Sequence, residues 1–169
     1  MRTFVSIVLA VWASGAFAFD SAAWHAKREA QTREALRLRS DYTNCVAHLQ
    51  TPAEDVTVPI ETFEDGSVKV VVTARKAQYF VDHGLVWAED VVVRKFKRDG
   101  SVAARIEAKH CVVDRLSKSG WAEGPATVVH DKTTFKGRGV YFSSPESYVK
   151  VFESSEIESK DLKFGGVTP

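Results

Sequence analysis

The stretch DGSVKVVVTA, residues 65–74, returns 34 residues further along the chain as DGSVAARIEA, residues 99–108. In each copy every second side chain is apolar, which is the pattern of a β-strand that buries one face. The Asp-Gly pair that opens each copy is typical of a tight turn between strands. The inward-facing set is expected to be Val68, Val70, Val72 and Ala74 in the first copy, and Val102, Ala104, Ile106 and Ala108 in the second.

Further repeats extend this pattern. The tripeptide WAE at 87–89 recurs at 121–123, again 34 residues later, and KGRGVYF at 136–142 parallels ARKAQYF at 74–80. In this shorter third copy Gly139 takes the position of Ala77, and Tyr141 takes that of Tyr79. Cys111 falls at the same small-residue position in the second copy. A small side chain there lets the backbone bend or approach a neighbour closely.

Each repeat therefore predicts a strand, a bend at a small residue, a second strand and a turn. Further turns are expected at His83-Gly84 and Ser119-Gly120. One such unit cannot bury its apolar face alone, so the units must stack. The prediction is a mainly β, open-ended structure with an apolar interior. Its edge strands would carry unpaired backbone groups that can accept another strand.

The first 18 residues predict a secretory signal. Arg2 supplies the positive start, residues 4–17 are mostly apolar, and small residues at Ala16 and Ala18 indicate cleavage before Phe19. An uncleaved membrane anchor is the alternative, but the apolar stretch is short for the roughly 20 residues that a span needs.

Residues 19–50 are expected to contain a helix. No Pro or Gly interrupts residues 22–44, and Asp20 or Ser21 can cap the first turn with a side-chain oxygen. This segment is the most basic part of the protein, through Lys27, Arg28, Arg33, Arg37 and Arg39. Such a helix face is either simply solvated, or it docks on a partner or a membrane surface.

Charge and cysteine content limit the expected partners. The chain has 23 basic and 22 acidic residues, and loss of Arg2 with the signal makes the two numbers equal. Bulk charge therefore gives no indication of nucleic-acid binding. In an exported protein Cys45 and Cys111 can form one disulfide, and the alternative of two buried thiols stays open.

Neither a catalytic nor a metal-binding centre is predicted, and no cofactor is expected. None of the five histidines forms a spaced ligand pair on one element. His110 and Cys111 are neighbours on a strand and point to opposite faces, which argues against a Cys–His nucleophile. The GRG segment at 137–139 lies inside a strand pattern and not at a helix N-terminus, so it is not a phosphate loop. Trp87 and Trp121 are expected to pack between units and not to stack on sugars.

Residues 56–162 resemble the OstA-like domain, a family shared by the periplasmic lipopolysaccharide transport proteins LptA and LptC. The resemblance rests on Asp-Gly followed by Ala at 65–74 and 99–108, on small-x-Tyr-Phe at 77–80, and on GRGVY at 137–141 before a valine-rich strand. It implies a twisted β-jellyroll, open at both ends, through which acyl chains pass. The basic N-terminal helix and the two cysteines depart from the family pattern, and residues 163–169 are expected to form a tail.

The resemblance also implies a function. A periplasmic protein of a Gram-negative-type bacterium would carry or bridge lipopolysaccharide between membranes by holding its acyl chains. Its partners would be that lipid, other OstA-like transport proteins joined through edge strands, and further copies of itself. The acyl chains are expected to contact Val68, Val70, Val72, Tyr79, Val102, Ala104, Ile106, Val140 and Phe142. The alternatives are a scaffold protein that assembles by edge strands without lipid, and a periplasmic hydrolase or sugar-binding protein.

Overall fold

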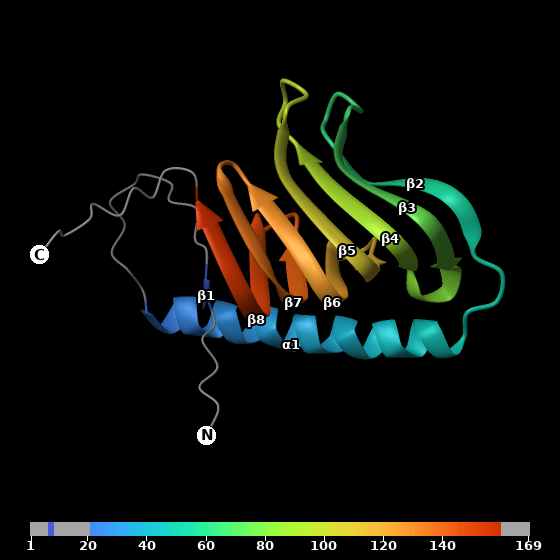
Figure 1. The fold of residues 1–169 in the computed structure, drawn as a ribbon, viewed down its shortest axis with the longest axis horizontal. Helices are drawn as coiled ribbons and strands as arrows, with labels where there is room; N and C mark the ends of the chain where they lie inside the picture. The colour runs from blue at the N-terminus through green and yellow to red at the C-terminus, as the bar shows by residue number, and fades with distance from the viewer. Residues whose placement is uncertain (1–6, 9–20, 160–169) are drawn as a thin grey trace, which may run out of the picture.

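The structure is a computed structural model that describes residues 7–8 and 21–159 (Figure 1). These residues form a long helix, α1 (Ser21–Ala47), a short 3-10 helix, η1 (Val81–His83), and eight strands. The strands are β1 (Ile7–Val8), β2 (Ala53–Thr62), β3 (Val68–Phe80), β4 (Leu85–Phe96), β5 (Val102–Asp114), β6 (Ser119–His130), β7 (Thr133–Ser143) and β8 (Tyr148–Ser159).

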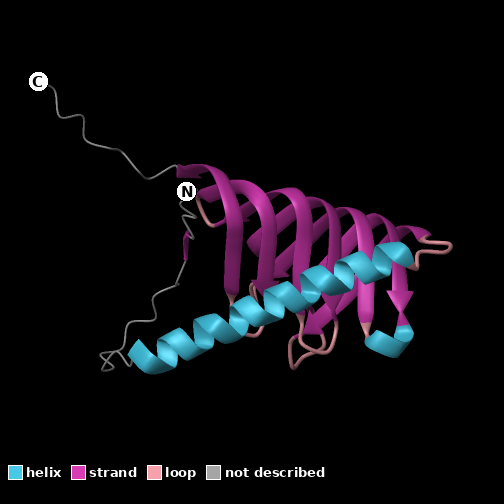
Figure 2. Cartoon of the chain, turned by 90° about the horizontal axis from the view of Figure 1, so that it is seen from below, coloured by secondary structure: helices cyan, strands magenta, loops and turns pink. Residues whose placement is uncertain are grey.

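All strands belong to one open antiparallel sheet. Strands that follow one another in sequence are neighbours, which gives the order β1-β8-β7-β6-β5-β4-β3-β2. The strands arch strongly, and α1 crosses them on one side (Figure 2). The predicted fold class is therefore confirmed: the chain is mainly β, with an open, twisted, jellyroll-like sheet and one N-terminal helix.

The Asp-Gly turns form as the repeat predicts. The Asp65 carboxylate accepts a hydrogen bond of 2.9 Å from the backbone N–H of Ser67, and Asp99 makes the same 2.9 Å bond with Ser101. The glycine of each turn has φ 81°, a conformation that costs glycine little. The turn expected at Ser119-Gly120 is wrong, because both residues lie in β6 and the turn spans the residues before them.

The strands switch faces near their middle, and this lets the sheet curve around its interior. In β4, Val91 and Val93 face inward, and so does Ala88, although it lies an odd number of positions, three, before Val91. The break in alternation falls at Asp90, which has φ 51°. Gly124 in β6 and Gly139 in β7 also have positive φ, at 76° and 65°. These positions bend the strands in the way that bulges do.

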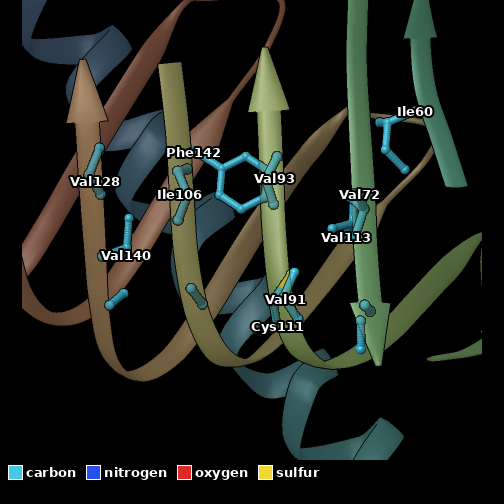
Figure 3. Packing of buried hydrophobic residues seen from close by; sticks show 14 of the residues in the cluster. Ile60, Val72, Val91, Val93, Ile106, Cys111, Val113, Val128, Val140 and Phe142 are labelled. Carbon is cyan, nitrogen blue, oxygen red and sulfur yellow. The ribbon is translucent and has the colours of Figure 1, made fainter. Parts of the chain in front are cut away.

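The concave side of the sheet holds the larger apolar core, which we call the inner cluster (Figure 3). Its buried members include Val70, Val72, Ala77, Val93, Ile106, Cys111, Val113, Val140 and Phe142. Small residues line up across the strands at one level, where Ala77 pairs with Ala88, Ala88 with Cys111, and Cys111 with Ala122. The small-residue position predicted for Cys111 is therefore confirmed.

The opposite side of the sheet packs against α1 in a second core, which we call the outer cluster. Its members are Ala35, Leu38, Cys45, Leu85, Trp87, Val112, Trp121, Tyr141 and Tyr148. The buried positions of the helix are residues 31, 35, 38 and 45, which fall on one face at helical spacing. The helix lies within residues 19–50, the segment for which a helix is expected.

The third repeat is shifted by one residue from its predicted alignment. Tyr141 pairs with Trp121 and faces α1, so it shares the face of Gln78 and not that of Tyr79. Val140, and not Gly139, pairs with Ala122 at the level of the small residues, and just beyond this pair the register changes, because β6 has two residues, Glu123 and Gly124, opposite the single Gly139 of β7. Because side chains alternate across a strand, a slip of one residue moves each of them to the other face.

Several predictions fall outside the described residues. These are the cleavage site before Phe19, the cap at Asp20, and the tail at 163–169. Of the expected signal, the structure describes only Ile7 and Val8, which pair with Val151 and Lys150 of β8.

Candidate functional site

A cavity of about 230 Å³ opens beside the inner cluster, between the ends of β3, β4 and β5 and the turn that joins β7 to β8. Its walls are predominantly apolar. They are formed by Val70, Val93, Lys95, Ala103, Ala104, Ile106, His130, Phe142, Ser143, Ser144, Ser147, Tyr148 and Val149. An apolar cavity with a few polar groups at one side is the usual form of a small-molecule site.

The shape of the cavity depends on Phe142, whose ring lies among Ile106 and Val93 (Figure 3). The ring occupies the space that Gly120 leaves on the neighbouring strand. A Cβ atom on Gly120 would lie 2.7 Å from Phe142 Cε1 and 2.9 Å from Cε2, and closer still to Cζ. The absence of a side chain at Gly120 therefore sets the position of one cavity wall.

A group of connected polar side chains, the polar rim, lies at one side of the cavity, and three of its members, Lys95, Ser144 and Ser147, line the cavity. The polar rim consists of Glu61, Lys69, Lys95, Lys118, Ser144 and Ser147. Lys95 Nζ donates to Ser147 Oγ at 2.7 Å and to the backbone oxygen of Ser144 at 3.3 Å. The polar rim thus ties the β7–β8 turn to strand β4.

Glu61 on β2 is the only carboxylate of the polar rim. It accepts a hydrogen bond from the Ser144 hydroxyl and pairs with Lys69 Nζ at 2.9 Å. Lys118 Nζ lies 3.7 Å from the same carboxylate. Burial by itself raises the pKa of Glu61, but the hydrogen bonds from Ser144 and Lys69 outweigh it and hold that pKa below 4.5.

Lys95 has a different environment from the other two lysines. Burial, and after it the nearby charge of Lys69, lowers the pKa of Lys95, and Glu61 offsets this in part. Among the described residues, Lys95 has no carboxylate within ion-pair distance of its ammonium group. It is a partly desolvated cation held by two neutral oxygen atoms.

The nine predicted lipid contacts fall into three groups. Val70, Ala104, Ile106 and Phe142 line the cavity. Val72 and Val140 belong to the inner cluster but are buried behind the cavity wall, at 1% and 0% exposure.

The other three predicted contacts lie outside the cavity. Val68 and Val102 begin their strands directly after the turns and are 40% and 50% exposed, and Tyr79 is 46% exposed. Tyr79 lies near the end of β3, under the guanidinium group of Arg115. The prediction that these three side chains lie in the apolar interior is therefore wrong. They lie near strand ends, where the sheet extends beyond the side chains that cover the middle of each strand.

Sequence reasoning did not identify Lys95. Its position could have been found, since the inward alternation Val91, Val93 continues to Lys95. The serines of the β7–β8 turn gave no comparable signal, because they lie outside the repeated segments.

The disulfide does not form in this structure. Cys45 and Cys111 are both free and buried, and they belong to the outer and inner cluster respectively. Burial raises the pKa of Cys111 to about 12 and that of Cys45 to about 11.

His110 stacks on Trp87 with ring centroids 6.2 Å apart, on the face opposite to Cys111, as the alternation predicts. The described residues contain no group of three or more His, Cys, Asp or Glu side chains suited to a metal ion.

The two repeated tryptophans are packing residues. Trp87 and Trp121 are 5% and 2% exposed and lie beneath α1, and Trp121 Nε1 donates to Glu123 at 2.6 Å.

Two basic residues of α1 contact the sheet. Arg37 pairs with Asp114 of β5 at 2.7 Å. Arg39 lies over the Trp121 ring at 5.7 Å.

A scan against protein-family models finds no match to this chain, and a search of curated proteins finds no significant match. Within the part of the chain that the structure describes, no helix is both long and apolar enough to cross a membrane.

Proposed function

We propose that this protein is a lipid-binding module that holds the acyl part of a lipopolysaccharide-like lipid in the periplasm. The expected signal at residues 1–18 would export it. The observation that carries the proposal is the cavity beside the inner cluster, which has apolar walls and opens to one side. The resemblance of residues 56–162 to OstA-like transport proteins supports the same class of ligand.

The energetics favour an aliphatic ligand. Each methylene group that leaves water for an apolar environment contributes about 0.8 kcal/mol. Five or six methylene groups in contact with Val70, Ile106 and Phe142 would therefore contribute about 4–5 kcal/mol. A sugar ring would find few hydrogen-bonding partners on such walls, which argues against a carbohydrate-binding role.

Lipid crosslinking or native mass spectrometry of the purified protein tests the proposal. Ala104→Trp should fill the cavity and remove bound lipid, because Ala104 lines it. Val92→Trp is the matched control: this half-buried residue lies on β4 between two inward-facing valines and points to the other face. Loss of lipid in the first variant only is expected. Equal lipid occupancy in both folded variants would contradict the proposal.

The second candidate is a scaffold that assembles by strand addition. The observation in its favour is the open sheet, in which β2 forms one edge and only two residues of β1 pair with β8 at the other. This candidate predicts concentration-dependent chains in sedimentation experiments and no co-purifying lipid. Edge pairing with other OstA-like transport proteins is compatible with either candidate.

A further inference from the structure

Among the residues that the structure describes, the polar rim has more basic than acidic side chains. Lys69 and Lys118 share the single carboxylate of Glu61, at 2.9 and 3.7 Å. Lys95 adds a third cation, whose hydrogen bonds go to the neutral oxygens of Ser144 and Ser147. The polar rim thus contains three ammonium groups and one carboxylate, and of these four groups Lys95 lines the cavity. The excess charge is complementary to an anion.

The position of Lys95 beside the apolar wall of the cavity indicates which kind of anion would fit. Lys95 pairs across the sheet with Ala104, and Val93 precedes it on the same face of β4. Its side chain therefore lies against the wall that continues through Ile106 to Phe142. A ligand that reaches both regions needs a charged end and an aliphatic body.

Lys95 is a cation for which the described part of the chain provides no counter-charge at ion-pair distance. Taking an ammonium group out of water costs free energy unless an opposite charge or good hydrogen bonds replace the lost hydration. The ammonium group of lysine has three donors, and two described acceptors take only two of them. An anionic head group would supply both the missing acceptor and the missing charge, and charge-assisted hydrogen bonds are the stronger kind.

We propose that the cavity binds one acyl chain of an amphiphile with an anionic head group, and that Lys95 binds the head group. This inference rests on the proposed lipid-binding function and adds the charge class of the lipid. The cavity volume of about 230 Å³ is below the range of about 300–1,000 Å³ that is usual for ligand pockets, which favours a single chain over several. Selectivity then comes from Lys95, because the apolar walls cannot distinguish one head group from another.

The test uses four single-chain amphiphiles with the same dodecyl chain, each below its critical micelle concentration. Dodecyl phosphate and dodecanoate carry anionic heads, dodecyl maltoside is neutral, and dodecyltrimethylammonium is cationic. Isothermal titration calorimetry with the purified chain should show that at least one anion binds about tenfold or more tightly than the neutral and cationic compounds. A preference between the two anions identifies the phosphate or the carboxylate as the head group.

Variants then assign the selectivity to one residue. Lys95→Gln should weaken binding of the preferred anion about tenfold or more and change binding of dodecyl maltoside by less than about twofold. Lys97→Gln is the matched control, because Lys97 lies two residues away, is exposed, and does not line the cavity. Lys95→Arg keeps the charge and should retain most of the anion preference.

The outcomes separate this inference from the function on which it rests. If none of the four compounds binds, the proposed lipid-binding function fails. If all bind with equal affinity, or if Lys95→Gln behaves like Lys97→Gln, lipid binding stands and the role of Lys95 is overturned. Should Lys95→Gln fail to fold, the comparison of the four compounds on the unmodified chain still decides whether an anion is preferred.

Discussion

Replacing Gly120 by alanine is the most direct test of how the interior is packed. The added Cβ atom would lie 2.7 and 2.9 Å from two ring atoms of Phe142, whereas carbon atoms pack best at about 3.5–4.0 Å. The ring is only 6% exposed and has Ile106 and Val93 beside it, so it can move away from the new Cβ atom only by shifting toward the cavity that it lines. Overpacking of this kind costs about 1–3 kcal/mol.

A smaller effect acts in the opposite direction. Replacing glycine by alanine restricts the unfolded chain and contributes about 0.4–1 kcal/mol of stability where the native backbone accepts alanine. The steric term is larger, so Gly120→Ala should lower the free energy of unfolding by about 1–2 kcal/mol. Urea unfolding followed by circular dichroism and by tryptophan fluorescence measures this difference.

A double-mutant cycle identifies the cause of the loss. Phe142→Leu removes the ring atoms that would collide with the new Cβ atom, so Gly120→Ala should cost little in that background. We expect a coupling energy of about 1 kcal/mol or more between the two positions. Unchanged stability of Gly120→Ala, or strictly additive effects in the double variant, would show that the ring does not occupy the space beside Gly120.

Three further predictions concern the helix, the polar rim and the thiols. Leu38→Ala should lower the free energy of unfolding by about 2–5 kcal/mol, since Leu38 is fully buried between α1 and the sheet, and calorimetry or urea unfolding measures it. The folded-state pKa of Glu61 lies below 4.5, so ionised Glu61 stabilises the fold above pH 4.5 and this contribution is lost as pH falls through the folded pKa. Glu61→Gln should therefore flatten the acid branch of the pH–stability curve. Cys111, with its pKa raised to about 12 by burial, should resist iodoacetamide at neutral pH until the protein unfolds, and intact mass under non-reducing conditions should show no disulfide.

Much of the sheet could be predicted because two physical signals coincide in the repeated segments. Alternation with a period of two identifies the buried face of a strand, and the repeat shows where each strand starts. These signals predict that Val70, Val72 and Ile106 lie on the inner face, and all three are buried there. The chain order also fixes the topology, since antiparallel strands joined by short turns become neighbours.

The third repeat shows where such reasoning fails. The sequence aligns Gly139 with the small residue Ala77, but the equivalent position is Val140, which pairs with Ala122, and Gly139 is the residue with φ 65° just before it. Nothing in the residue type distinguishes these two alignments. The consequence reaches beyond Gly139, because Tyr141 then faces α1 and not the interior.

The cavity was harder to predict than the sheet, because it depends on where the strands bend. Whether Val102 is buried or Ala104 lines a cavity depends on how far the β7–β8 turn reaches over β5, and alternation contains no information on that distance. Lys95 was overlooked for a related reason: a lysine at the end of an apolar alternation usually marks the point where a strand enters solvent.

The polar rim also sets the free-energy cost for a lipid that enters by displacing it. Four polar contacts hold the two closing turns against β2 and β4: Lys95 with Ser144 and with Ser147, and Glu61 with Ser144 and with Lys118. At about 0.5–1.5 kcal/mol each, their loss would cost about 2–6 kcal/mol. At about 0.8 kcal/mol for each buried methylene, a chain needs about three to eight methylene groups inside to offset that cost. Long acyl chains exceed this number and short ones do not. If entry displaces the polar rim, affinity should remain low for short chains and rise steeply once the chain is long enough, whereas entry through the open side should give an even increase in affinity with each added methylene group.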